Sequence, residues 1–73
     1  MTREELKIGT IVRYKTYPNT YVIDNVCEMK MPDGEWVDGV VYIGRNKVTH
    51  EPMVFVREIS SFLRSFSICN NLS

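Results

Sequence analysis

The chain has 73 residues, of which 44% are hydrophobic and 25% charged. This composition is typical of one small globular domain, and it excludes disordered, collagen-like and disulfide-scaffold proteins. Nine Lys and Arg balance nine Asp and Glu, and a net charge of zero weakens any function that depends on holding a long track of nucleic acid.

The N-terminal segment predicts a helical turn followed by a strand. Thr2, with Glu5 three residues later, has the spacing of a capping box, so we expect a short helical turn over residues 3–6. Between Lys7 and Lys15, Val12 and Tyr14 alternate with Ile11, Arg13 and Lys15, and β-branched residues suit the pleat of a β-strand. The first strand is therefore expected over residues 7–15.

The next segment predicts a turn, a long strand and a hairpin. Residues 17–20 contain Pro and Asn, which favour a turn, and a second strand follows over residues 20–31. Asp24-Asn25 interrupts its alternation, so we expect a β-bulge there. Pro32-Asp33-Gly34 is the strongest turn signal in the chain and predicts a tight hairpin.

The third strand is expected over Trp36–Ile43. Asp38-Gly39 lies inside it and could form either a second hairpin turn or a bulge. The bulge is the preferred interpretation, because a turn there would leave a strand of only three or four residues before it. Residues 44–47 end the strand, and residues 45–51 form a polar loop.

The last part of the chain changes from the period of a strand to that of a helix. Pro52 fits the first position of a strand, and Met53–Arg57 is the fourth strand. Ile59, Phe62, Leu63 and Phe66 then follow at helical spacing, which predicts a helix of about two turns. In an alternative, a short closing strand contains Phe66 and Ile68, and the helix stops near Leu63.

These elements predict a mainly β fold. Strands joined by tight turns would expose both edges if they formed an open flat sheet. At this size we expect a small SH3-like fold, in which a strongly bent antiparallel sheet makes a partly open barrel of four to five strands. The short C-terminal helix would close one open end with Phe62 and Phe66. We expect one domain over residues 1–73.

Targeting signals are not evident. The start of the chain is polar, with no apolar segment after it that would indicate a signal peptide. The longest aliphatic or aromatic run, Val40–Ile43, has four residues, whereas a membrane span needs about 20. Cys27 and Cys69 are the only cysteines, which favours reduced thiols over a disulfide framework. The sequence therefore predicts a soluble, cytoplasmic protein that does not bind membranes.

Motifs for catalysis or for a cofactor are not found. His50 is the sole histidine, and Cys27 and Cys69 stand far from it in the sequence, without the paired spacing of a metal site. The four glycines stand singly, so no phosphate-binding loop is expected. We therefore expect no enzyme, no catalytic residue, no metal and no cofactor.

The charges separate into two groups. Residues 28–38 carry four carboxylates and one lysine, a net charge of −3, and residues 45–50 carry a net charge of +2. Exposed aromatic residues ringed by charge are common at protein interfaces. The candidate partner-binding residues are Trp36, Glu35, Asp33, Tyr17, Arg45 and Lys47.

The order of several short motifs resembles a known family. These motifs are Arg13-Tyr14-Lys15, Tyr21-Val22-Ile23, Val40-Val41-Tyr42 and Phe55-Val56-Arg57, with Phe62 five residues later. Together they resemble the small bacterial and phage family called domain of unknown function 1653, over about residues 9–66. The resemblance implies an SH3-like all-β fold, and it implies no activity and no functional residue.

Protein binding is the function that these observations favour. A small barrel presents loops and an edge rather than a deep ligand cavity, so we expect a non-enzymatic protein-binding module, such as a phage or mobile-element accessory regulator that acts on a host protein. Self-association through an uncovered edge strand at 53–57 is a further possibility. The alternative is a small nucleic-acid-binding barrel that uses Arg13, Lys15, Arg45, Lys47 and Arg57.

Overall fold

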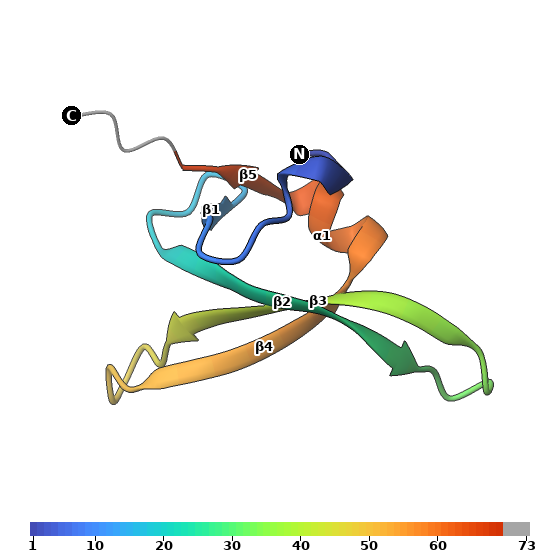
Figure 1. Ribbon diagram of the computed structural model, residues 1–73. Helices are drawn as coiled ribbons and strands as arrows, with labels where there is room; N and C mark the ends of the chain where they lie inside the picture. Colours follow the sequence, from blue (N-terminus) through green and yellow to red (C-terminus); the bar gives the residue numbers. More distant parts are fainter. Residues whose placement is uncertain (70–73) are drawn as a thin grey trace.

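A computed structural model gives the fold of the protein and describes residues 1–69. Five antiparallel strands form one bent, unclosed sheet in the order β4-β3-β2-β1-β5 (Figure 1). Its elements are η1 (Arg3–Glu5, a 3₁₀ turn), β1 (Ile11–Tyr14), β2 (Thr20–Lys30), β3 (Trp36–Arg45), β4 (Pro52–Glu58), α1 (Ile59–Ser65) and β5 (Phe66–Ile68). The predicted mainly β fold is therefore confirmed. Residues 70–73, which the sequence analysis places in the same domain, lie outside the described part.

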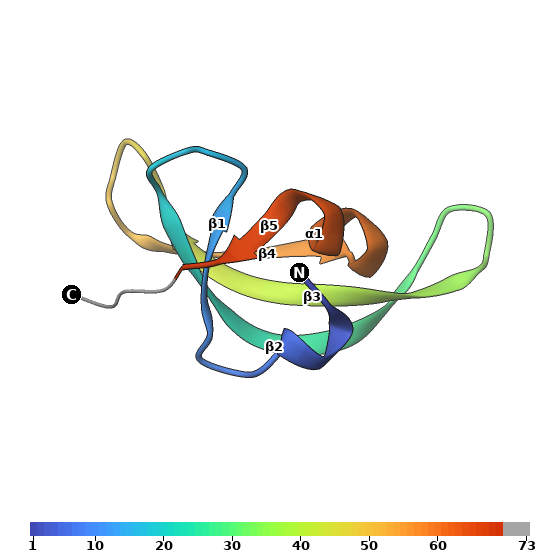
Figure 2. The ribbon, with the colours of Figure 1, turned by 90° about the horizontal axis from the view of Figure 1, so that it is seen from above.

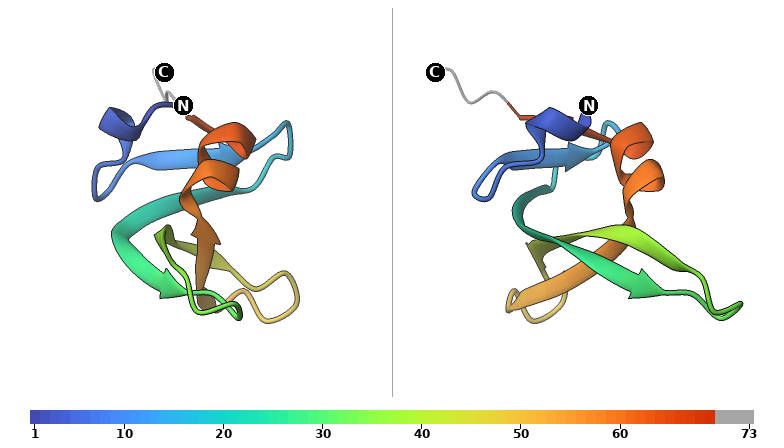
Figure 3. Two further views of the ribbon diagram at one scale, coloured as in Figure 1. Left: turned by 90° about the vertical axis from the view of Figure 1, so that its right-hand side faces the viewer. Right: turned by 45° about the vertical axis from the view of Figure 1, so that its right-hand side comes forward.

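The bend of the sheet separates it into two parts. β1 and the start of β2 lie on one side, and β3 and β4 lie on the other, while the long β2 passes between them (Figure 3). The helix α1 and the strand β5 cover the inner side of this bend (Figure 2). The β2–β3 and β3–β4 turns project at opposite ends of the molecule, whose longest dimension is 43 Å.

The first strand is shorter than expected. It begins at Ile11 rather than Lys7, because residues 7–10 form a turn in which the Thr10 N–H donates to the Lys7 carbonyl at 3.0 Å. Gly9 in this turn has a φ of 91°, which glycine adopts at little cost, and its N–H donates to the Ile23 carbonyl at 2.8 Å. The turn therefore ties the start of β1 to β2.

The long β2–β3 hairpin confirms one predicted bulge and contradicts the other. The register shifts between Ile23 and Asn25, so the bulge at Asp24 is present. Asp38 and Gly39, by contrast, pair regularly with Glu28 and Cys27, and the bulge expected there is wrong. A glycine fits the regular ladder because the side chains of Met29 and Cys27 fill the space that its own side chain would occupy.

The C-terminal elements follow the alternative interpretation of the sequence. Pro52 takes the first position of β4, as predicted, and α1 begins directly after that strand. The Glu58 carboxylate caps α1 by accepting hydrogen bonds from the backbone N–H groups of Ser60 at 2.7 Å and Ser61 at 3.1 Å. The helix ends at Ser65, and Phe66 begins the short strand β5, which pairs with β1.

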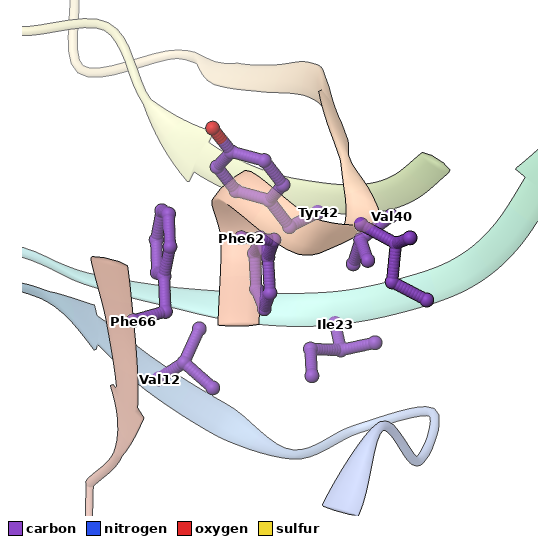
Figure 4. Packing of buried hydrophobic residues seen from close by; sticks show 7 residues of the cluster. Val12, Ile23, Val40, Tyr42, Phe62 and Phe66 are labelled. Atoms are coloured by element: carbon purple, nitrogen blue, oxygen red, sulfur yellow. The ribbon is translucent and has the colours of Figure 1, made fainter. Parts of the chain in front are cut away.

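The core lies between β3 on one side and β1 and β2 on the other, and two phenylalanines fill it (Figure 4). Phe62 is fully buried, and its ring stacks on that of Phe66 with the centroids 4.1 Å apart. Fully burying such a side chain contributes about 1.5–3 kcal/mol. The core cluster is Val12, Ile23, Val40, Tyr42, Ile59, Phe62 and Phe66. Within residues 1–69, no polar or charged residue is buried.

Candidate interaction surface

The central strand β3 is apolar on both of its faces. Successive side chains of a strand point to opposite sides, and Val40 and Tyr42 enter the core with 0% and 5% of their surface exposed. Val37, Val41 and Ile43 therefore point to the opposite side, away from α1. None of these three belongs to the core cluster or packs against it.

The register of the neighbouring strands extends this second apolar side. Val22 pairs with Ile43, which pairs with Val54, so their three side chains form one row across the sheet. We call the resulting surface the outer face; it consists of Val22, Cys27 and Met29 from β2, Val37, Val41 and Ile43 from β3, and Val54 and Val56 from β4. Across these rows the other members are Asn25, Gly39 and Glu58, and the Glu58 carboxylate is bound to the start of α1 as its cap. No charged side chain lies among the eight.

The outer face is open to solvent. Val54, Val56 and Val22 expose 66%, 50% and 40% of their surface. Among residues 1–69, α1 and β5 lie on the other side of the sheet, and no helix lies beneath β3 and β4 (Figure 1). Seven residues of β3 by three strands cover about 23 Å by 14 Å, or roughly 300 Å². Apolar patches of this size on small proteins often mark an interaction site.

One end of the outer face carries the acidic hairpin. Asp33 stabilises the turn of this hairpin, since its carboxylate accepts a hydrogen bond from the Glu35 N–H at 2.9 Å. Trp36 exposes 60% of its surface, and the Lys30 ammonium lies 5.8 Å from the centre of its ring. Continuing the alternation of β3, Glu35 occupies the outer side at the tip, where its carbonyl accepts from the Met31 N–H at 2.7 Å.

The opposite end carries the basic loop and an open groove. The groove has a volume of about 890 Å³, more than expected for so small a domain, and its lining includes Tyr17, Arg45, Lys47 and His50. The Arg45 guanidinium donates to the His50 carbonyl at 2.8 Å, which holds the loop. The structure therefore separates the six candidate residues into an acidic group with Trp36 and a basic group with Tyr17, at opposite ends of the sheet (Figure 2).

Arg57, one of the basic residues expected to bind nucleic acid, contacts side chains of the protein's own core. Arg57 lies over the rings of Tyr14 and Phe66, at 5.1 and 5.6 Å, and donates to the Tyr42 hydroxyl at 3.5 Å. The hydrogen bond to Tyr42 raises the pKa of Arg57 above its ordinary value, against a smaller opposing effect of burial. Arg57 therefore stabilises the aromatic cluster, a set of rings in mutual contact that consists of Tyr14, Tyr21, Tyr42, Phe55, Phe62 and Phe66.

Other kinds of site receive no support from the geometry. Among residues 1–69, no three His, Cys, Asp or Glu side chains gather closely enough to hold a metal ion. Over the same residues, no helix has the length and the apolar character needed to cross a membrane. Cys27 and Cys69 are free thiols, both half-buried.

Comparison of the chain with protein-family models, with curated proteins and with solved structures gives no match. The resemblance to the domain of unknown function 1653 family, with the SH3-like barrel that it implies, therefore stays a prediction from the sequence.

Sequence reasoning missed the outer face, although a signal for it was present. Val40–Ile43 is a run of consecutive apolar residues, which is typical of a strand that is covered on both sides. The run indicated one buried side and one further apolar side. Only the register identifies which residues of β2 and β4 share that further side.

Proposed function

We propose that the protein is a non-enzymatic protein-binding module and that the outer face is its interface. One observation carries this proposal: eight apolar side chains on three neighbouring strands lie together without cover. Strands that are apolar on both sides normally have another layer packed on each side. In this chain α1 and β5 supply one such layer, and a second polypeptide would supply the other.

The test places charge on the outer face at its most exposed positions. The double variant Val54→Lys/Val56→Lys should keep its fold, because both side chains are largely in solvent, but it should lose its protein partners. Ile8→Lys is the matched control, since Ile8 is an apolar residue that is 75% exposed in a turn away from the outer face.

The measurement is affinity capture, both of untagged copies of the protein and of other polypeptides, after circular dichroism has verified the fold of each variant. We expect the double variant to lose bound polypeptide while Ile8→Lys retains it. Equal binding by the double variant and the parent chain would refute the proposed interface. The finer hypothesis of a phage or mobile-element regulator of a host protein requires, in addition, that the captured protein belong to the host.

A second candidate function, nucleic-acid binding, is favoured by the groove at the basic end. Tyr17, which is 56% exposed, lies with Arg45 and Lys47 around that groove, and aromatic rings beside cations suit single-stranded nucleic acid. This function predicts a gel shift at about 50 mM salt that weakens steeply as the salt concentration rises. It also predicts that Lys47→Glu abolishes the shift. The lack of any shift with single or double strands would eliminate this candidate.

A further inference from the structure

We propose that the outer face is covered by a second copy of this chain, packed face to face with its strands in the opposite direction. In this dimer Glu35 at the hairpin tip of each protomer meets the partner's Arg45. The inference rests on the proposed function, because it names the partner of that same surface.

The composition of the outer face favours a second copy of this chain as the partner. Its side chains are aliphatic or sulfur-containing, and it lacks the Trp, Tyr and Arg residues that dominate the binding energy of transient interfaces. Homodimer interfaces are more apolar than transient ones and resemble a domain core cut in half. The inner faces of β-sandwiches, which pack about 10 Å apart, have this aliphatic character.

The charges at the two ends select the relative direction of the two copies. Residues 28–38 carry a net charge of −3 and residues 45–50 a net charge of +2, and they lie at opposite ends of the same sheet. If two copies packed with parallel strands, like charges would meet at both ends. If they pack with antiparallel strands, each acidic tip lies against a basic loop, so the surface is complementary to itself under a two-fold axis.

Glu35 and Arg45 are suitably placed for this contact. Arg45 is the last residue of β3 and Glu35 directly precedes its first residue, so an extended chain would separate them by about 34 Å, with both on the outer side. Val40 is midway between them. A two-fold axis that lies between the two faces, perpendicular to the strands and level with Val40, therefore places the Glu35 of one protomer opposite the partner's Arg45. β3 is the middle strand of the three that form the outer face, and the same axis lays the apolar rows of the two copies over each other.

The area is sufficient for a dimer of moderate affinity. A surface of about 34 Å by 14 Å, from hairpin tip to loop, amounts to roughly 500 Å² per copy. The two copies together would bury about 1,000 Å², which is near the lower limit for a specific interface. We therefore expect a dissociation constant in the micromolar range.

Self-association by pairing of the sheet edges would not cover the outer face. β4 is the longer free edge of the sheet, with seven residues, whereas β5 at the other edge has three. Self-association through the edge strand at 53–57, the possibility given by the sequence, would join two β4 strands side by side. Such a dimer would extend the sheet but leave both outer faces in water. Face-to-face packing removes Val22, Val54 and Val56 from water, which is where the hydrophobic free energy lies.

The decisive experiment uses two variants of opposite charge. Glu35→Lys makes the hairpin tip more positive, and Arg45→Glu makes the loop more negative. Each variant alone would place like charges against each other at both ends, so sedimentation equilibrium at low salt should show self-association at least about tenfold weaker than in the parent chain. An equimolar mixture of the two variants restores opposite charges at both ends and should dimerise again. Because Arg45 also holds the His50 carbonyl, recovery in the mixture separates a lost charge from a damaged loop.

The two thiols report independently which surface is covered. Cys27 lies on the outer face, and Cys69 follows β5, outside it. As the protein concentration rises through the dissociation constant, alkylation of Cys27 should slow about tenfold while alkylation of Cys69 stays constant.

Three results would overturn the inference. First, a protein that stays monomeric at millimolar concentration has no second copy on its outer face. If Val54→Lys/Val56→Lys then still abolishes the capture of a different polypeptide, the outer face remains the interface and only the identity of the partner is wrong. A dimer in which Cys27 remains reactive is joined at an edge. A dimer that the two charge variants do not weaken is not packed in the proposed direction.

Discussion

The substitution Gly44→Ala tests the aromatic cluster between β3 and the rest of the sheet. An alanine Cβ at this position would lie 2.5 Å from two ring carbons of Tyr21 and 3.2 Å from the ring of Phe55. Carbon atoms prefer separations of about 3.5–4.0 Å, so the Tyr21 ring would have to move by about 1 Å. Two further sides of that ring are closed, because Tyr42 and Phe66 also contact it edge to face, with centroids 5.4 and 5.8 Å away. The ring can move only toward the open groove that it lines, which would break these contacts.

Two opposing effects decide the sign of the result. Alanine restricts the unfolded chain more than glycine does, which alone would stabilise the protein by about 0.4–1 kcal/mol, since Gly44 does not have a left-handed backbone. Overpacking of a tight core costs about 1–3 kcal/mol. We therefore expect a net loss of about 1–2 kcal/mol, with a fall in Tm of about 4–8 °C for each kcal/mol.

Gly39→Ala is the matched control on the same strand. Its Cβ would lie 2.7 Å from the Sδ atom of Met29, which belongs to a flexible side chain on the open outer face and can move aside. Thermal and urea unfolding followed by circular dichroism should show Gly39→Ala near the parent chain and Gly44→Ala well below it. If Gly44→Ala is as stable as the parent, Tyr21 is not confined as described, and the account of the cluster is wrong.

Substitutions at three further positions test individual side chains. Arg57→Ala removes the guanidinium from the Tyr14 ring and should lower the unfolding free energy in urea by about 1–2 kcal/mol, and Arg57→Lys should not fully restore it; an unchanged midpoint would contradict this. Backbone hydrogen bonds to the helix cap lower the pKa of Glu58 below its ordinary 4.5, so the stability that it provides is present above that pH and is lost as the pH falls below it. The variant Glu58→Gln should therefore lose less Tm than the parent chain does when the pH falls below 4.5. If both proteins lose the same Tm, other carboxylates cause the acid dependence. Asp38→Asn breaks the exposed ion pair with Arg3 at 3.0 Å and should cost under about 1 kcal/mol, with no difference from the parent in 1 M salt.

The elements that sequence analysis placed well depend on a few neighbouring residues. The hairpin at Pro32-Asp33-Gly34 forms because Gly34 can adopt a φ of 92°, which closes the turn. The bulge at Asp24 was visible as a break in the alternation of apolar residues. Pro52 marks the start of β4 because it cannot donate to a central ladder.

The elements that were wrong or ambiguous depend on residues from distant parts of the chain. Gly39 stays in the ladder because Met29, ten residues away, covers it. Residues 7–10 turn because Gly9 donates to the carbonyl of Ile23. The division between α1 and β5 at Phe66 depends on β1 being free to accept a partner strand. The outer face likewise required the register of three strands.

The pairing of β1 with β5 has a consequence for how the protein is made. Tyr14 cannot meet its partner Phe66 until the ribosome has added every residue between them, which takes about 3–10 s at usual rates of translation. Phe62, the centre of the core, also comes after β1–β4 in the chain. During those seconds the growing hairpins have no layer on either side, so the nascent chain is most exposed to aggregation, and to helper proteins, just before Phe62 and Phe66 are added.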